Sequence, residues 1–339
     1  MRLAARAKPG SEGKRGDVAI QPSDTLGQQQ RLMVRVAKMY HEHGVRQPQI
    51  AEQLHLSQAK VSRLLKRAEE TGIVKVTVHA PLGYFSDLEE ALVEKYSLAD
   101  AVVAETTSDD DAELLATIGG AAAAYFSEIL LGHERIGISS WSATLLAMVN
   151  RMRDTRRQVA DSVVQVIGGV GEPQAQVQAT RLAEQLATLT GAQPVFLPAP
   201  GFVSSAALRQ AILNEPYVKE VSEVWPGLSI LLAGIGSLDP SPLLRESGNA
   251  IPLGDQVELR RLGAIGDVCL RFFNEHGEAV DSSIDGRIVG IPVDVLHSVP
   301  RRIGVAGGTR KHAAIRAALL GGWVNVLITD TGTAKALLD

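Results

Sequence analysis

The segment from residue 57 to residue 67 is rich in side chains that can hydrogen-bond to nucleic acid. Arginine and lysine bind guanine and phosphate oxygens, glutamine pairs with adenine, and the methyl group of alanine can contact thymine. These types predict non-covalent recognition of DNA. The residues suited to base edges are Gln58, Ala59, Lys60 and Arg63. The residues suited to phosphate contacts are Ser62, Lys66, Arg67 and the upstream Arg46.

A second group of candidates lies in the sequence RIGVAGGTRKHAAI. An expected strand is followed here by Gly307, Gly308 and Thr309, and Lys311 comes within the first turn of an expected helix. Glycine lets a backbone approach a ligand closely, and the amino end of a helix favours negative charge, to which the ammonium adds a full positive charge. The turn therefore predicts a phosphate site. The alternative is a tight strand-to-helix turn with Lys311 in solvent.

Hydroxyl groups crowd the segment IGISSWSATL, where an expected strand meets an expected helix. Ser139, Ser140, Ser142 and Thr144 could bind a sugar or a phosphate there. Alternatively, Ser140 or Ser142 simply caps the helix. A third segment, VIGGVGEPQAQ, is rich in glycine but has no cation, and is a weaker candidate.

Carboxylates could support a different chemistry, an isomerase or hydrolase reaction that needs a general base. The available candidates are Asp267, Asp330 and Glu172, for which we favour roles in capping or solvation. The eight histidines show neither the spacing of a metal cluster nor a Ser-His-Asp arrangement. We therefore expect no catalytic residue, no bound metal and no cofactor.

Three helices position the DNA-binding candidates. The first spans about residues 30 to 43, and Gly44 ends it. The second runs from about Gln47 to Leu54, with Pro48 in its first turn, where a missing N–H costs nothing. The apolar residues of these two helices recur at three- and four-residue spacings, and are Leu32, Met33, Val36, Ala37, Tyr40, Ile50, Ala51 and Leu54.

The third helix reads from Gln58 to Thr71, and Ser57 is suited to cap it. Its apolar stripe is Val61, Leu64, Leu65 and Ala68. This order is typical of a helix-turn-helix domain, whose recognition helix enters the major groove by its amino end, so Ser57 joins the DNA-binding set. The β-branched run from residue 73 to 78 predicts a wing strand or the entry to the next domain. The alternative is an amphipathic hairpin with solvated charges.

Charge is unevenly divided along the chain. Residues 1–78 contain fourteen Lys and Arg against seven Asp and Glu, a formal charge of +7, whereas the whole chain carries −4 and the remainder therefore −11. Cations supply most of the non-specific affinity for nucleic acid. The asymmetry thus separates a DNA-binding end from an acidic body.

The body alternates β-rich and helical segments. Strand-like segments such as AVVAE, RIGIS, VVQVIGG, SILLAGIG, VCLRFF, RIVGIP, RIGVAGG and VNVLITD are separated by helical stretches near residues 112–130, 142–152, 175–190, 204–213 and 309–320. This alternation predicts an α/β fold with a largely parallel sheet and helices on both faces. In such sheets, ligands bind at the carboxyl ends of the strands.

The segment IAEQLHLSQAKVSRLLKRAEETGIVKVTV resembles the N-terminal domain of the SorC-type, DeoR-related sugar-binding regulators. The turn after RIGIS, GAIGDVCLRFFNEHGEAVD and AGGTRKHAAIRAALLGGWVNVLITDTGTAKALL resemble the rest of that family. The resemblance implies a body with the sugar-phosphate isomerase and CoA-transferase fold. It also implies that Asp267 binds sugar hydroxyls and that Lys311 binds phosphate with Ser140 and Thr144, with Gln178 as a weaker candidate.

One departure from the family pattern concerns the turn after RIGIS. The family has Gly-x-Thr after an aromatic residue, whereas Trp141 here is followed by Ser142, Ala143 and Thr144. The loss of that glycine limits how closely the backbone can approach a phosphate, although the threonine hydroxyl is kept.

These observations predict a cytoplasmic transcriptional regulator of carbohydrate or polyol metabolism. We expect a disordered arm at 1–28, a helix-turn-helix domain at 29–80 and an effector-binding and oligomerisation domain at 86–339. The expected partners are double-stranded operator DNA, a phosphorylated sugar or polyol and further copies of the chain in a dimer or tetramer, with no membrane. The alternatives are a sugar-phosphate isomerase or hydrolase with an appended DNA-binding domain, and a non-specific DNA binder. The single cysteine, Cys269, favours a reducing compartment.

Overall fold

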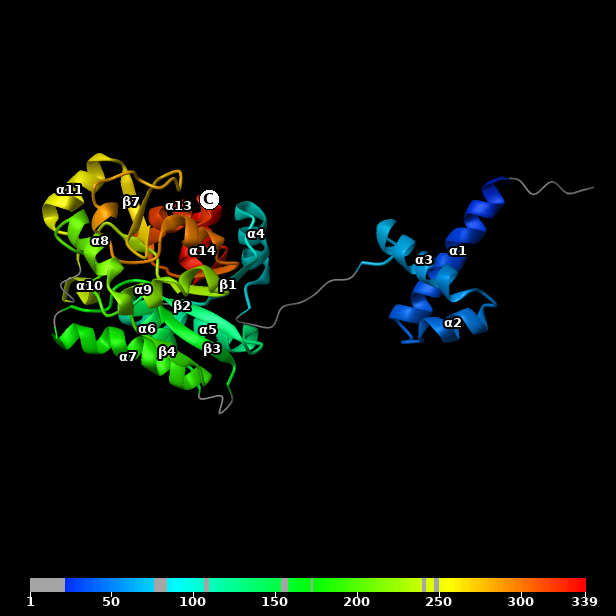
Figure 1. Ribbon diagram of the computed structural model, residues 1–339. Helices are drawn as coiled ribbons and strands as arrows, with labels where there is room; N and C mark the ends of the chain where they lie inside the picture. Colours follow the sequence, from blue (N-terminus) through cyan, green and yellow to red (C-terminus); the bar gives the residue numbers. More distant parts are fainter. Residues whose placement is uncertain are drawn as a thin grey trace, which may run out of the picture. The chain divides into compact units, whose positions relative to one another are not determined.

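The computed structural model describes residues 22–75, 84–106, 110–153, 158–171, 173–239, 242–246 and 250–339. Side chains are described for all of these except residues 22–26, 173–175, 178 and 242–243. The chain forms two compact units, Met1–His79 and Ala80–Asp339 (Figure 1).

The first unit contains helices α1 (Pro22–His41), α2 (Gln47–Gln53) and α3 (Gln58–Glu70). The stripe predicted for the third helix is buried, as is most of that predicted for the other two. The buried residues form one apolar cluster of Met33, Val36, Ala37, Ile50, Ala51, Val61, Leu64, Leu65 and Ala68. Three short helices therefore share a single core.

The first helix differs from its prediction at both ends. It begins at Pro22, within the stretch 1–28 that the sequence predicts to be disordered. Proline suits a first helical turn, and glutamines such as those at 28–30 favour helix. Tyr40, predicted on the apolar face, is 39% exposed, because it lies in the last turn and packs edge-on against His41. The strand predicted from residue 73 to 78 lies largely outside the described residues.

The second unit is built on a seven-stranded sheet in the order β1-β10-β9-β5-β2-β3-β4, in which every pair is parallel. The α/β fold with a largely parallel sheet is thus confirmed. The strands are β1 (Asp100–Ala104), β2 (Glu134–Ile138), β3 (Ala160–Gln165), β4 (Gln193–Val195), β5 (Ile230–Ala233), β9 (Arg301–Val305) and β10 (Val326–Asp330).

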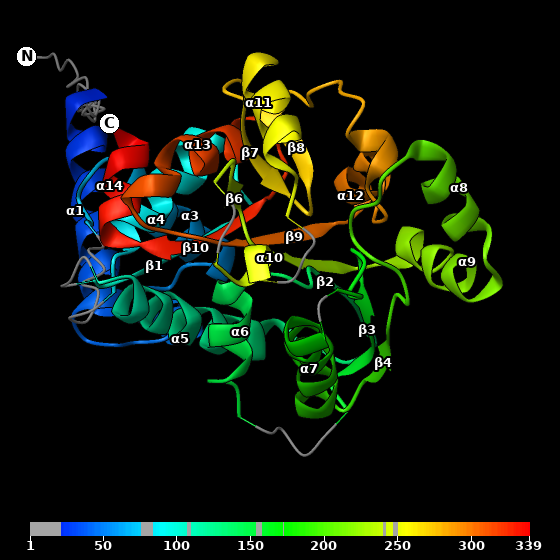
Figure 2. The same ribbon diagram turned by 90° about the vertical axis from the view of Figure 1, so that its left-hand side faces the viewer.

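Helices cover both faces of this sheet, as Figure 2 shows. One apolar cluster joins the sheet to α5 (Asp111–Ile129), α6 (Ala143–Val149) and α7 (Pro173–Thr190). A second cluster covers the opposite face. It involves α4 (Ser86–Tyr96), α8 (Ala206–Asn214), α9 (Pro216–Ser222), α12 (Val293–Ser298), α13 (His312–Leu320) and α14 (Thr331–Leu338). None of the described helices is long and apolar enough to span a membrane.

A small antiparallel sheet adds to the body. It contains β6 (Gly236–Ser237), β7 (Ala264–Val268) and β8 (Arg271–Asn274), and a third apolar cluster lies beneath it, near α10 (Pro242–Glu246) and α11 (Leu253–Arg261). The prediction of VCLRFF as one strand is wrong, because the chain reverses at Cys269 and Leu270, with φ of 54° and 59°. Such turns usually contain Asn or Gly, which are missing here.

The segment RIVGIP is also not a strand. It makes only isolated bridges, Phe202 with Ile288 and Ile167 with Gly290, and a short 3-10 turn (Asp285–Arg287) includes its first residue. Two further 3-10 turns are Trp225–Gly227 and Thr309–Lys311, the latter directly before α13. The helix predicted from residue 309 therefore begins at His312.

The sheet reverses its direction of growth between β2 and β5. From β2 the chain adds β3 and β4 on one side, whereas from β5 it adds β9 and then β10 on the other. The loops that leave β2 and β5 therefore separate, and a crevice opens at the carboxyl ends of these strands.

A buried arginine fastens the small sheet to the irregular segment beside it. The Arg271 side chain is 4% exposed and pairs with Asp285 at 3.1 Å. Its Nε donates to the carbonyl oxygen of Ile291 at 2.9 Å, and Nη2 donates to that of Gly290 at 3.1 Å. The guanidinium thus satisfies carbonyl groups that no regular sheet partner reaches.

Replacing Arg271 with Met should lower the free energy of unfolding by about 2–4 kcal/mol, because buried acceptors lose their donors. Urea denaturation, monitored by circular dichroism, would measure this change in the free energy of unfolding. The matched control is Arg261→Met, which removes an exposed arginine whose Nη2 lies 2.8 Å from Glu258 Oε1 and should change the free energy of unfolding far less than Arg271→Met does, because water and salt screen exposed pairs. Equal losses in both variants would contradict the role assigned to Arg271.

Candidate functional site

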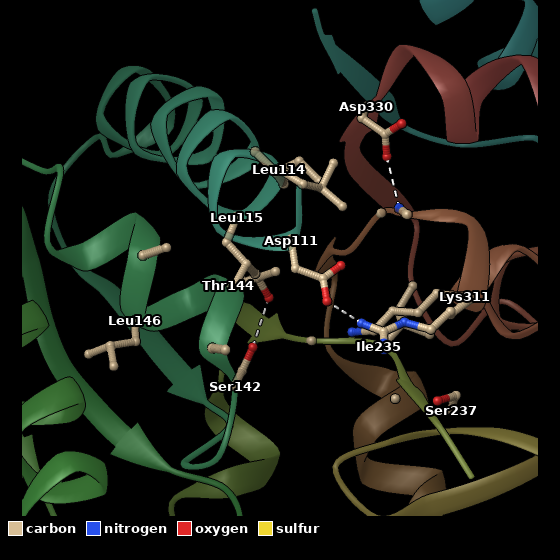
Figure 3. Close-up of a pocket in the computed structure, with 18 of the residues that line it drawn as sticks. Asp111, Leu114, Leu115, Ser142, Thr144, Leu146, Ile235, Ser237, Lys311 and Asp330 are labelled. Carbon is tan, nitrogen blue, oxygen red and sulfur yellow. Dashed lines mark hydrogen bonds and ion pairs between the residues drawn. The ribbon is translucent and has the colours of Figure 1, made fainter. Parts of the chain in front are cut away.

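A cavity of about 1630 Å³ lies at the carboxyl ends of the central strands. Its walls come from the loops after β2, β5, β9 and β10, from the β7–β8 turn and from the start of α5 (Figure 3). Eight of the ten predicted effector residues line it: Ser139, Ser142, Thr144, Asp267, Gly307, Gly308, Thr309 and Lys311. The tertiary fold thus brings together three segments that are far apart in the sequence.

The remaining two predicted residues are Ser140 and Gln178. Ser140 is 2% exposed and does not line the cavity, and its hydroxyl donates to the carbonyl oxygen of Ile167 at 2.9 Å. Trp141 Nε1 similarly donates to the carbonyl oxygen of Gly168 at 3.0 Å. The glycine-rich segment after β3 therefore supports the loop after β2. The Gln178 side chain and Glu172 lie outside the described residues.

The hydroxyl groups of Ser142 and Thr144, after β2, differ in whether they can donate a hydrogen bond to a ligand. Thr144 Oγ1 donates to the carbonyl oxygen of Val305 at 2.8 Å, so its proton is committed to the protein. Ser142 Oγ lies 2.9 Å from Thr144 Oγ1, and it accepts from the N–H of Leu145 as the cap of α6. Ser142 can turn its proton from Thr144 to a ligand at the loss of one bond, whereas Thr144 can only accept.

The turn after β9 is organised by Asp330. The N–H of Gly308 donates to Asp330 Oδ2 at 3.0 Å and to Thr333 Oγ1 at 2.9 Å, and the carboxylate also caps α14 through the N–H of Thr333. The Gly308 amide is thus already used. Within the described part of the chain, the N–H groups of Gly307 and Thr309 make no hydrogen bond.

Two glycines allow carboxylates to approach the backbone. A Cβ at Gly236 would collide with Asp267 Oδ1, and one at Gly307 would collide with Asp330 Oδ2. Gly236 lies in β6 and pairs with Asp267 of β7. Any larger residue at either position would move a carboxylate of the cavity wall.

Asp267 and Lys311 give the cavity one negative and one positive group. Burial raises the pKa of Asp267 to about 6, although the N–H of Leu270 and the charge of Lys311 oppose the shift. Burial lowers the pKa of Lys311, and the charge of Asp267 opposes that shift. No direct ion pair joins the two in the described part of the chain. Both groups are therefore available to a ligand that lies between them.

Several cavity residues escape prediction from sequence. They are Trp141 and Ile235, the Cys269–Leu270 turn and the start of α5, which includes Asp111 and Leu114. The Gly-Ile-Gly sequence after SILLA is a signal that could have indicated the loop after β5, since it follows a buried strand at the point where the sheet reverses. Nothing in the sequence marks the start of α5 as part of a cavity wall, because this helix reaches the cavity only through packing.

Two polar atoms of the wall are buried without a hydrogen-bond partner among the described residues. They are Thr106 Oγ1, after β1, and His312 Nε2, at the start of α13. Such atoms need a ligand or an ordered water. The described residues hold no group of three or more His, Cys, Asp or Glu side chains suited to a metal.

The helical unit exposes its candidate residues on α3 and its cap Ser57, and at Arg46, before α2. Ser57 caps α3 by accepting from the N–H of Lys60 at 3.3 Å, as predicted. Arg63 Nε donates to the carbonyl oxygen of Ala59 at 3.2 Å, which holds its guanidinium beside the first turn. Lys66 Nζ lies 4.0 Å from Glu70 Oε1. All nine candidates are exposed: Arg46, Ser57, Gln58, Ala59, Lys60, Ser62, Arg63, Lys66 and Arg67.

Comparison with known proteins places this geometry in a family. Residues 81–339 match the family model Sugar-bind, a sugar-binding domain. The chain is 30% identical over 312 residues to the deoxyribonucleoside regulator of Bacillus subtilis, a match that covers 92% of this chain and 98% of that protein. It is 31% identical over 314 residues to the sorbitol operon regulator of Klebsiella pneumoniae, with 91% and 98% covered.

The crystal structure of the full-length sorbitol operon regulator SorC from Klebsiella pneumoniae is similar to this fold, with a TM-score of 0.70. The sequences are 27% identical in that alignment, which covers 91% of this chain and 99% of that one. The chain belongs to the SorC-type family of sugar-binding transcriptional regulators. The family resemblance and the fold class predicted from the sequence are thereby confirmed.

This member of the SorC family is accordingly a DNA-binding transcriptional regulator with a C-terminal sugar-binding domain. The named relatives are regulators rather than enzymes. In this regulator, Asp330 serves as a helix cap and backbone acceptor, as favoured from the sequence.

The raised pKa of Asp267 predicts a pH effect on the regulator's stability. The folded-state pKa of about 6 exceeds the ordinary 3.8, so ionisation of Asp267 opposes folding as pH rises between these values. Asparagine does not ionise, so the free energy of unfolding of Asp267→Asn should increase relative to that of the wild type as pH rises from about 4 to about 6. Above pH 6 the difference between the two proteins should stay constant.

Urea denaturation at several pH values would measure the difference. Asp281→Asn, which alters an exposed carboxyl, controls for the change of net charge. Parallel pH profiles of the free energy of unfolding for the wild type and Asp267→Asn would contradict the raised pKa of Asp267.

Proposed function

We propose that this protein regulates an operon of carbohydrate or polyol metabolism, and that a phosphorylated sugar or polyol bound in the cavity controls its affinity for operator DNA. The observation that carries the proposal is the pairing of Lys311 and Asp267 in one cavity without a direct ion pair. A ligand with an anionic end and several hydroxyls can contact both.

The anionic end fits beside Lys311. The N–H groups of Gly307 and Thr309 are free of hydrogen bonds within the described part of the chain, and both residues line the cavity. The amino end of α13 lies in the same turn and favours negative charge. The backbone therefore adds neutral donors to the ammonium, an arrangement that suits a phosphate.

The hydroxyl-bearing end fits toward Asp267. An ionised carboxylate only accepts hydrogen bonds, so sugar or polyol hydroxyls are suitable donors to it. Ser142 can donate after its hydroxyl turns, and Thr106 and His312 offer unpartnered polar atoms. These groups suit a polar ligand rather than an apolar one.

The nine exposed candidates of the helical unit would contact DNA. The amino end of α3 presents Gln58, Lys60 and Arg63 in the manner of a recognition helix, while the remaining cations suit phosphates. Helix-turn-helix proteins bind half-sites about one helical turn apart as dimers, which supports a homo-oligomer such as a dimer or tetramer.

Control by an effector requires only that the ligand bind the DNA-competent and DNA-incompetent arrangements with different affinities. Coupling of this kind is typically worth about 1–3 kcal/mol. The enzyme alternative loses a candidate general base, because the Asp330 carboxylate is tied to Gly308 and Thr333. A protein that only binds DNA non-specifically would not need an effector cavity.

Replacing Arg63 with Ala should weaken binding to the operator well beyond its effect on random DNA, because a contact with a base edge carries about 1–3 kcal/mol of discrimination. Fluorescence anisotropy with both DNAs at one salt concentration would measure it. Lys66→Ala is the matched control, since loss of a phosphate contact should weaken both DNAs alike. Equal losses of affinity for operator and random DNA in Arg63→Ala would show that Arg63 contacts only phosphate.

Replacing Lys311 with Ala should abolish the influence of effector on DNA binding and leave DNA affinity without effector nearly unchanged. A thermal-shift screen of phosphorylated and unphosphorylated sugars and polyols would first identify a ligand, since binding to the folded state raises the melting temperature. DNA titration with and without that ligand would then test the variant.

The control for this variant is Lys335→Ala, which removes an exposed cation from the cavity wall. It should keep the effector response. An unchanged response in Lys311→Ala would remove Lys311 from the site, and stabilisation by unphosphorylated sugars alone would contradict a phosphorylated effector.

A further inference from the structure

An ion pair joins two separate parts of the cavity wall. Arg310 precedes Lys311 in the 3-10 turn after β9, and Asp111 is the first residue of α5. Arg310 Nη2 lies 2.5 Å from Asp111 Oδ2. Both residues line the same cavity as Lys311. The pair therefore connects the turn that carries the predicted phosphate site with a helix from the other end of the domain.

This ion pair is easy to displace. The two side chains are 79% and 67% exposed, and exposed pairs of this kind contribute little because water and salt screen them. A phosphate is a stronger partner for Arg310 than the Asp111 carboxylate, since it carries more negative charge and can accept two parallel hydrogen bonds, whereas Asp111 accepts one. A phosphate beside Lys311 could thus take Arg310 from Asp111.

The charges of the pair act on Lys311. Arg310 lowers the pKa of the Lys311 ammonium and Asp111 raises it, after the larger effect of burial. The three groups therefore lie within one electrostatic field. While Asp111 holds Arg310, the guanidinium of Arg310 is not free to contact an entering anion.

We propose that Arg310 is a second phosphate ligand of this cavity, which Asp111 holds until an anionic effector displaces it. The inference rests on the proposed function, because it assumes that the anion binds at Lys311. Arg310 would strengthen the discrimination between a phosphorylated effector and its unphosphorylated form, and Asp111 would set the affinity threshold.

The structure offers variants that should fold. The cap of α5 is Asp110, whose side chain accepts from the N–H groups of Ala112 and Glu113, so Asp111→Asn leaves the helix cap in place. Arg310 is exposed, so Arg310→Ala opens no cavity in the core. Arg151→Ala is a matched control, because Arg151 is another exposed cation of the cavity wall.

The experiment measures the affinity of the full chain for inorganic phosphate by isothermal titration calorimetry, at constant ionic strength maintained with chloride. Arg310→Ala should weaken phosphate binding by about tenfold, and Asp111→Asn should strengthen it by about threefold. The double variant should bind like Arg310→Ala, because Asp111 acts by holding Arg310. Arg151→Ala should bind like the wild type.

Two results would overturn the inference alone. An unchanged affinity in Arg310→Ala, with Lys311→Ala still weakened, would show that Arg310 is not a ligand. An equal gain from Asp111→Asn in the presence and absence of Arg310 would show that Asp111 only repels the anion. An absence of phosphate binding by the wild type, or an affinity that Lys311→Ala does not change, would refute both the proposed phosphate site and this inference.

Discussion

The reversal of the parallel sheet between β2 and β5 is the constraint on which the site depends. Parallel strands end at one edge, so the loops after β2, β5, β9 and β10 all meet there. Because the chain leaves β2 and β5 in opposite directions, those loops diverge beyond the point where Gly234 lies against Ser142. The cavity is therefore a consequence of strand order, and its walls can vary without loss of the sheet.

The charges of Asp267 and Lys311 oppose the stability of the folded protein. The folded protein raises the pKa of Asp267 and lowers that of Lys311, since burial disfavours both charges, and it does not join them directly. Asp330 behaves differently, because backbone and hydroxyl donors surround it and it holds two elements in place. One carboxylate thus organises the wall, and another is left for a ligand.

The DNA-binding unit is a small three-helix core with its candidate contact residues on the surface. Its small core of α1, α2 and α3 fixes the direction of α3, and every candidate contact residue stands on the exposed side. The match to the sorbitol operon regulator of Klebsiella pneumoniae spans 91% of this chain, so both units lie within the family pattern.

Local patterns in the sequence were enough to determine the buried stripe Val61, Leu64, Leu65 and Ala68, the cap at Ser57 and most strands of the large parallel sheet. These features depend on periodicity and on neighbours within a few residues. Only the tertiary structure decided that Ser140 turns to Ile167, that the Gly308 amide is occupied and that Arg310 meets Asp111. Those contacts join residues distant in sequence, and the direction of a hydroxyl, an amide or a guanidinium depends on atoms that only folding brings near.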